Sequence, residues 1–209
     1  MKHELGISVY PDLMPLEKIE SYFELASRYG VSKVFSSMFS VEGTKEEVLD
    51  YFKKLIVAAH KNKLKVSLDV NPMCFEKMGA KPDDLSVFKS IDVDFLRMDL
   101  SYGPENDAKL VRNPYGITIE FNNSPEIVKG LIENGIDPKD FLVCHNFYPH
   151  RYSGLNFEHF MRCTERFNKY GLRTAAFITS QNEGTFGPWP VTDGLPTLEL
   201  QIGRAHVWT

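Results

Sequence analysis

The sequence has few of the features that identify disulfide-bonded, metal-binding or membrane proteins. It contains only three cysteines among 209 residues, Cys74, Cys144 and Cys163, which are widely separated and form no CxxC pair. An odd and scattered set of this kind argues against a disulfide framework or a zinc site and suits reduced thiols. The sequence also shows no apolar run long enough for a signal peptide or a membrane span. We therefore predict a cytoplasmic protein with no membrane partner.

The usual signals for nucleic-acid and dinucleotide binding are also missing. The 24 basic and 28 acidic residues give a formal net charge of -4, and no basic run is present. We therefore expect no nucleic-acid partner. The first β-rich segment is followed by Pro11–Met14, which is neither a GxGxxG segment nor a P-loop. We expect no cofactor, and no feature of the sequence indicates an oligomeric state.

What the sequence does contain is a regular alternation of β-rich and amphipathic segments. In Lys45–Lys61, for example, Val48, Phe52, Leu55 and Ala59 fall on one helical face behind a capping Thr44. The same periodicities along the chain predict strands at Glu4–Tyr10, Val31–Phe35, Leu64–Val70, Phe95–Met98, Tyr115–Glu120, Phe141–Phe147 and Leu172–Ile178. They predict helices at Pro15–Tyr29, Lys45–Lys61, Pro72–Met78, Asp83–Ser90, Asn106–Val111, Pro125–Asn134 and Phe157–Tyr170.

This alternation predicts an α/β protein with a parallel sheet, because parallel strands need helical crossovers. We expect a (βα)8 barrel of the TIM type, since polar residues recur at the carboxyl ends of the predicted strands, where such barrels place their active sites. A doubly wound open sheet is the alternative. The absence of a glycine-rich first loop makes that alternative the weaker one.

The pattern breaks after Ile178. Thr179–Asp193 is rich in small and polar residues and predicts a long functional loop, and Gly194–Glu199 suits the start of a seventh helix. The last segment, Gln201–Thr209, has no periodicity and resembles a translated sequencing adaptor, so we exclude it from the fold as a non-native tail. Residues 1–200 then form one incomplete domain, truncated after its seventh strand, with two unpaired sheet edges.

The polar strand ends supply the candidate catalytic residues. Ile117–Asn123 is a β-rich run that ends on a carboxylate and two amides, and Asp99 follows the preceding strand. Two carboxylates that face one pocket suit glycoside cleavage, in which one is a general acid and the other a nucleophile or base. We predict Asp99 and Glu120 as this pair, with Asp69 as a reserve carboxylate.

Other polar and aromatic residues near the strand ends are predicted to contact substrate. Amide and guanidinium groups favour a polyhydroxylated or phosphorylated ligand, and aromatic rings can stack on sugars. The predicted substrate-binding residues are Tyr10, Arg97, Asn122, Asn123, His145, Asn146, Tyr148 and Arg151. Two alternatives stay open: Arg97 and Asp99 could simply form an ion pair, and Asp69, Glu120 and His145 could instead bind a divalent metal. We predict no metal site as the main interpretation.

Several of these segments, taken in order, resemble one known family over Met1–Glu199. The matching motifs are Gly6–Pro11, Val34–Ser37, Leu96–Asp99, Glu120–Ser124, Asn146–Pro149 with Ser153–Leu155, and Gly194–Glu199. Together they resemble the amino-terminal barrel of the bacterial 6-phospho-N-acetylmuramidases, a family earlier described as outer surface proteins of unknown function.

The resemblance implies an intracellular hydrolase that cleaves 6-phospho-N-acetylmuramyl–N-acetylglucosamine, a phosphorylated amino-sugar disaccharide, during cell-wall recycling. It also implies a carboxyl-terminal cyclophilin-like domain, which this sequence lacks. One departure concerns the phosphate site, because Phe186 stands before Gly187 and Pro188 where the family has a basic residue. Two alternative functions remain: a metal-dependent sugar-phosphate isomerase or epimerase, and an inactive sugar-binding fragment.

Overall fold

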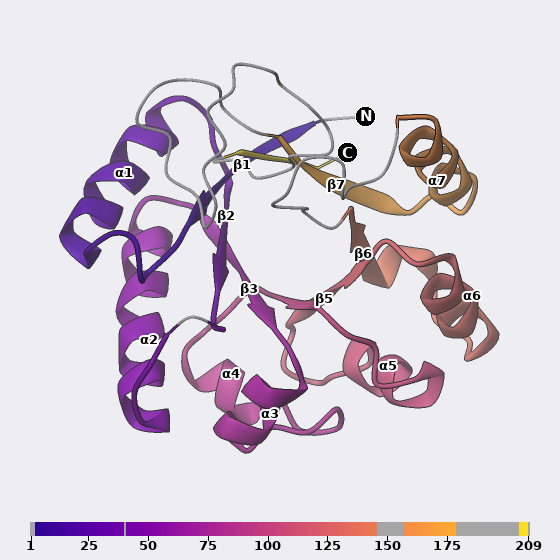
Figure 1. Cartoon of the computed structure of the whole chain (residues 1–209), viewed down its shortest axis with the longest axis horizontal. Coiled ribbons are helices and arrows are strands. Elements are labelled where there is room, and N and C mark those ends of the chain that lie inside the picture. Colours follow the sequence, from indigo (N-terminus) through magenta and orange to yellow (C-terminus); the bar gives the residue numbers. More distant parts are fainter. Residues whose placement is uncertain (1–2, 40, 146–156, 179–204, 209) are drawn as a thin grey trace.

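The chain forms a closed β-barrel of seven parallel strands and one antiparallel strand, with helices packed around its outside (Figure 1). The computed structural model describes residues 3–39, 41–145, 157–178 and 205–208. The strands are β1 (Glu4–Val9), β2 (Lys33–Ser37), β3 (Lys65–Val70), β4 (Phe95–Met98), β5 (Thr118–Asn122), β6 (Phe141–Cys144), β7 (Arg173–Ile178) and β8 (Ala205–Trp208). The helices are α1 (Leu16–Arg28), α2 (Lys45–Lys61), α3 (Pro72–Met78), α4 (Ser86–Ser90), α5 (Pro104–Val111), α6 (Pro125–Glu133) and α7 (Phe157–Lys169), with a 3-10 turn, η1 (Pro138–Asp140).

Strands β1 to β7 are parallel and each pairs with the next one along the chain. This order confirms the predicted α/β architecture and rules out the doubly wound alternative, in which the strand order reverses. β2 begins and ends two residues later than predicted, and β5 begins three residues later and ends two later. β5 begins at Thr118 because the Asn113 side chain bonds the backbone of Ile117 and Gly116 has a positive φ of 74°, so a turn occupies the predicted start of the strand.

The segment excluded as a tail contributes a strand. β8 pairs antiparallel with β1 on one side and with β7 on the other, and so closes the ring. The two sheet edges that we expected to be unpaired are therefore covered over these residues, which removes the exposed backbone donors and acceptors that an open sheet would carry. An eighth parallel strand, as a complete (βα)8 barrel would have, is not present among the described residues.

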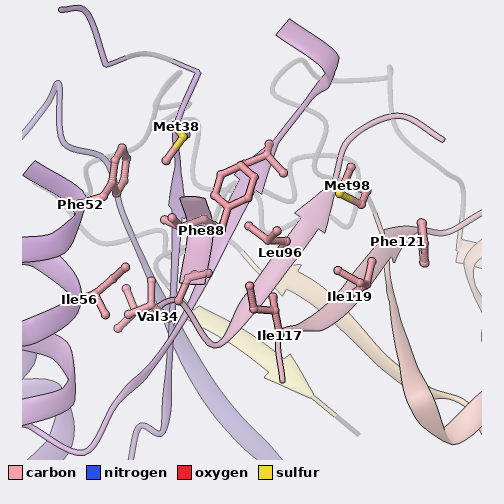
Figure 2. Packing of buried hydrophobic residues seen from close by; sticks show 14 of the residues in the cluster. Val34, Met38, Phe52, Ile56, Phe88, Leu96, Met98, Ile117, Ile119 and Phe121 are labelled. Atoms are coloured by element: carbon pink, nitrogen blue, oxygen red, sulfur yellow. The ribbon is translucent and has the colours of Figure 1, made fainter. Parts of the chain in front are cut away.

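Alternating residues of the strands face two separate apolar clusters. The outer cluster fills the space between strands and helices; Figure 2 shows some of its members, among them Val34, Leu96 and Ile119 from the strands and Phe52 and Phe88 from the helices. The inner cluster lies inside the barrel and consists of Phe35, Phe95, Leu142, Cys144, Ala175 and Phe177, with Tyr10 packed against it. Among the described helices, none is long and apolar enough to cross a membrane.

Two strands that carry candidate site residues run directly into capped helices. The Asn71 side chain accepts a hydrogen bond from the Cys74 backbone amide at 2.8 Å, and the Ser124 hydroxyl accepts one from the Ile127 amide at 3.3 Å. A proline follows each cap at the first helical position, where its missing N–H is not needed. These caps set the direction in which the chain leaves β3 and β5.

Removing residues 205–209 should destabilise the barrel, because β1 and β7 would each regain a row of unpaired backbone groups. We expect the melting temperature to fall by at least about 5 °C, which for a chain of this size corresponds to roughly 2 kcal/mol, and we expect self-association. Thermal unfolding and light scattering measure the two effects. Val207→Thr, which keeps a β-favouring residue, is the control; a monomeric deletion variant with an unchanged melting temperature would show that β8 adds nothing to the fold.

Candidate active site

Three carboxylates lie on the inner face of neighbouring strands at the carboxyl-terminal half of the barrel. Asp69 is near the end of β3, Asp99 follows β4 directly, and Glu120 is in β5. The strand register pairs Asp69 with Arg97 and Arg97 with Glu120. Since side chains alternate along a strand, Asp99 points to the same side as Arg97. The sequence prediction therefore named residues that the fold brings together.

Arg97 lies at the centre of this group. Its side chain is 0% exposed. One terminal nitrogen, Nη1, lies 2.5 Å from Asp69 Oδ1, the other donates to Asn122 Oδ1, and Nε lies 3.9 Å from Glu120 Oε1. A guanidinium can only donate hydrogen bonds, so Asp69 Oδ1 and Asn122 Oδ1 are the acceptors, whereas the longer contact with Glu120 is an ion pair. Arg97 thus connects side chains from the strands on both sides of β4.

Asn122 connects Arg97 to Asp99. Because its Oδ1 accepts from Arg97, its amide nitrogen must point the other way. That nitrogen donates to the Asp99 backbone carbonyl at 2.6 Å and lies 3.4 Å from the Asp99 carboxylate. Asp99 is half-buried, whereas Asp69 is 1% exposed. The carboxylate that reaches solvent is thus oriented by a chain of fixed donors.

Glu120, like Asp69, is fully enclosed by the protein, whereas Asp99 reaches solvent. Glu120 precedes Asn122 by two residues on the same face of β5, and its side chain is 0% exposed. Lys33 Nζ lies 4.0 Å from Glu120 Oε2 and 3.7 Å from the centre of the Phe95 ring. Glu120 is therefore placed between two cations. The sequence analysis did not single out Lys33, although a lysine inside the apolar predicted strand Val31–Phe35 is a signal for a buried ion pair.

Burial shifts the proton affinities of two groups in the site. It raises the pKa of Asp69 to about 6, against the opposing effect of the adjacent Arg97. It also raises the pKa of the Tyr10 phenol, and the negative charge of Asp69 adds to that shift. Tyr10 packs edge-on against Phe35, with ring centres 6.3 Å apart. Asp69 is thus a carboxyl that exchanges its proton near neutral pH, beside a phenol that stays protonated.

A small cavity of about 180 Å³ adjoins Tyr10. Its walls include Ser8, Leu13 and Met14, so it opens beside the carboxyl-terminal end of β1. A larger groove, of about 1050 Å³, lies between α1 and α2, and its lining includes none of the predicted site residues. The lining of the small cavity also includes Lys18 and Tyr22 of α1, so it lies between β1 and α1, and Tyr10 is the predicted site residue that borders it.

His145 and Asn123 point towards helix α7 instead. The Thr164 hydroxyl donates to the Phe160 carbonyl at 3.0 Å, so it accepts from His145 Nε2, which lies 3.0 Å away. His145 Nδ1 then accepts from the Asn123 amide at 2.6 Å. Burial, with a smaller effect of His159, lowers the pKa of His145 to about 4. The imidazole is neutral, and both of its nitrogens are engaged.

The ligand set considered for a metal ion is therefore not assembled. Asp69 and Glu120 contact Arg97, whereas His145 faces α7. Among the described residues, no three histidine, cysteine or acidic side chains are grouped so that they could hold a metal ion. Three of the predicted substrate-binding residues, Asn146, Tyr148 and Arg151, lie outside the described residues, as does Phe186. The roles predicted for all of these residues stay predictions.

The His145 contacts predict a pH-dependent stability. The folded state holds the neutral imidazole with a pKa of about 4, below the ordinary value of 6.5. The unfolded chain therefore binds more protons between these values, so this stabilisation is complete above about pH 6.5 and is lost as the pH falls towards 4. We expect the wild type to lose about 1–3 kcal/mol between pH 7 and pH 4.5 that His145→Gln does not lose.

Urea unfolding at the two pH values measures this difference, and ¹⁵N NMR of the imidazole identifies its tautomer. A proton on Nδ1, or a folded-state titration near pH 6.5, would contradict the hydrogen-bond assignment.

Comparison with solved structures shows two similar proteins. The chain is 38% identical to an uncharacterized B. cereus protein, with a TM-score of 0.80, over 96% of this chain and 55% of that one. It is 23% identical to a conserved Enterococcus faecalis protein of unknown function, with a TM-score of 0.76, over 94% of this chain and 54% of that one. The chain thus spans about half the length of these two proteins.

A more distant structure shares the fold alone. The citrate synthase SbnG matches 81% of this chain and 75% of its own with a TM-score of 0.54, at 13% identity. No curated protein matches this chain. The family model described as "6-phospho-N-acetylmuramidase, N-terminal" matches residues 5–204. Because this match covers nearly the whole chain, the protein belongs to the 6-phospho-N-acetylmuramidase family, whose amino-terminal domain it represents.

Proposed function

We propose that this chain is the catalytic barrel of a glycoside hydrolase that cleaves 6-phospho-N-acetylmuramyl–N-acetylglucosamine in the cytoplasm during peptidoglycan recycling. The observation that carries the proposal is the position of Asp69 and Asp99 at the carboxyl ends of neighbouring strands in a chain of this family. Hydrolysis of a glycosidic bond needs two carboxyl groups with different proton affinities, one of them an acid near working pH.

In this proposal Asp69 is the general acid. Its pKa of about 6 keeps part of the population protonated near neutral pH, which favours proton donation to the leaving oxygen. Asp99, which is half-buried and held by Asn122, is the second carboxylate and acts as nucleophile or general base. The sequence analysis assigned the acid–base pair to Asp99 and Glu120. We exchange the roles of Glu120 and Asp69 because Glu120 lies between two cations, Lys33 and Arg97, whereas burial raises the pKa of Asp69 to about 6.

The substrate contacts follow from the same geometry. Tyr10 follows β1 at the same end of the barrel as Asp69 and Asp99, and its protonated phenol can donate a hydrogen bond to a sugar oxygen. Arg97 and Asn122 contribute by holding Asp69 and Asp99. We keep Asn146, Tyr148 and Arg151 as predicted contacts of the sugar and its phosphate.

Asp69→Asn and Asp99→Asn should each lower the rate of disaccharide hydrolysis by at least about 10²-fold, the scale of general acid–base catalysis. The measurement is release of N-acetylglucosamine from the phosphorylated disaccharide, with and without EDTA. Asp94→Asn is the matched control: Asp94 lies at the opposite end of β4, where it accepts a hydrogen bond from the Val66 amide at 2.8 Å. We expect that variant to keep its activity below its unfolding temperature.

Three outcomes would count against this proposal. Absence of turnover by the wild-type chain would favour an inactive sugar-binding fragment, and near-wild-type activity of Asp69→Asn would remove Asp69 from the mechanism. Activity lost to EDTA and restored by a divalent ion would support the metal-dependent alternative.

A further inference from the structure

We propose that Lys33, at the amino-terminal base of the barrel, is a positioning residue for the carboxylates at the opposite end. It acts through Glu120 and Arg97, which hold Asp69 and, through Asn122, Asp99. The catalytic effect assigned to Lys33 rests on the proposed function. The row of contacts between the buried charges of Lys33, Glu120, Arg97 and Asp69, called the charge network below, does not.

The first contact of the charge network is the one between Lys33 and Glu120. Lys33 is the first residue of β2, so its backbone lies at the end of the barrel away from Asp99. Its side chain is nevertheless inside, 1% exposed in total, with the ammonium over the Phe95 ring and 4.0 Å from Glu120. Buried lysines are rare unless they are paired. The placement of Lys33 is therefore explained by its partner, Glu120.

The second contact joins Glu120 to Arg97. Glu120 presents one oxygen to Lys33 and the other to Arg97 Nε, at 4.0 Å and 3.9 Å. Arg97 in turn holds Asp69 at 2.5 Å. The four side chains thus alternate in sign, positive, negative, positive, negative, and all are nearly or fully buried. In a low-dielectric interior such charges are weakly screened, so a change at one end is felt at the other.

The consequence for Asp69 has a definite sign. Within the charge network, loss of the Lys33 charge leaves Arg97 as the cationic neighbour of Glu120. The positive charge of Arg97 is then shared more equally between Glu120 and Asp69. The Asp69 carboxylate is then less stabilised, and its pKa rises. The hold of Arg97 on the Asn122 amide weakens in the same way, which loosens Asp99. Both effects act on the proposed acid and its partner without any contact between Lys33 and substrate.

Lys33 also titrates in a range in which this effect is measurable. Burial lowers its pKa to about 8, and Glu120 opposes the shift. The other groups that influence the ammonium are Arg173, which lowers its pKa, and Glu4 and Cys144, which raise it. Glu4 and Arg173 also pair with each other, at 3.6 Å. Above about pH 8, where Lys33 loses its charge, the kcat of the wild type should therefore fall towards the value that Lys33→Met has at neutral pH.

The decisive experiment compares Lys33→Met, Glu120→Gln and the double variant with the wild type, in kcat, KM and pH profile. We expect Lys33→Met to lose roughly tenfold in kcat, the scale of coupling within a buried charge network, with KM nearly unchanged. The double variant, which buries neither charge, should recover most of that loss. Lys65→Met is the control, because Lys65 pairs with Lys33 in register on β3 but is exposed.

The double variant distinguishes positioning from catalysis. If Glu120 is itself the acid or base, the double variant stays inactive, and the proposal is wrong. If Lys33→Met fails to fold while the double variant folds and turns over substrate, the coupling is supported. An unchanged kcat and pH profile in Lys33→Met would overturn the proposal.

A measurement on the wild type alone needs neither variants nor substrate. The ¹³C resonance of the Asp69 carboxyl should show a second step, with a midpoint near pH 8, that follows the titration of Lys33 Nζ. Absence of that step would contradict the charge network, whether or not the protein hydrolyses the disaccharide. Presence of the step in a protein that hydrolyses no disaccharide would support the charge network and reject only the proposed function.

Discussion

The buried guanidinium of Arg97 is the contact on which the carboxyl-terminal end of this barrel depends. It holds groups from the strands on both sides, Asp69 from β3, and Glu120 and Asn122 from β5. A buried guanidinium without partners would strongly destabilise the fold, and so would these buried acceptors without the guanidinium. Each therefore depends on the other. This mutual requirement explains why a barrel interior, which usually fills with branched apolar side chains, here contains a layer of charge.

The arrangement separates structural from chemical carboxylates. Glu120 is fully buried and lies between two cations, Lys33 and Arg97. Asp69 is also buried, but burial outweighs its one cationic partner and raises its pKa to about 6. Asp99 reaches solvent and is oriented through Asn122. Three acidic residues on the same inner surface thus differ in their neighbours and in their access to solvent, and the proposed mechanism takes its acid and its base from this difference.

The closure of the barrel follows a different principle. The backbone of Ala205–Trp208 pairs with β1 and β7 although the segment runs antiparallel to both. Sheet edges accept any extended backbone that satisfies their donors and acceptors, whichever direction it runs. The pairing of this segment therefore follows from the unpaired backbone groups of β1 and β7. It carries no information about the chemistry at the candidate active site, where the polar residues of β3, β4 and β5 converge.

The sequence by itself determined the alternation of strands and helices, the family, and the faces on which the polar residues lie. Two-residue spacing is enough to place Arg97 with Asp99, and Glu120 with Asn122, because side chains alternate along a strand. Depth was not readable in this way. Glu120 lies between Lys33 and Arg97, and His145 turns towards Thr164, because the register between strands and the packing of α7 join residues that are far apart in the chain. Local periodicity fixes a direction for each side chain, whereas tertiary packing alone sets which groups it meets and how far it lies from water.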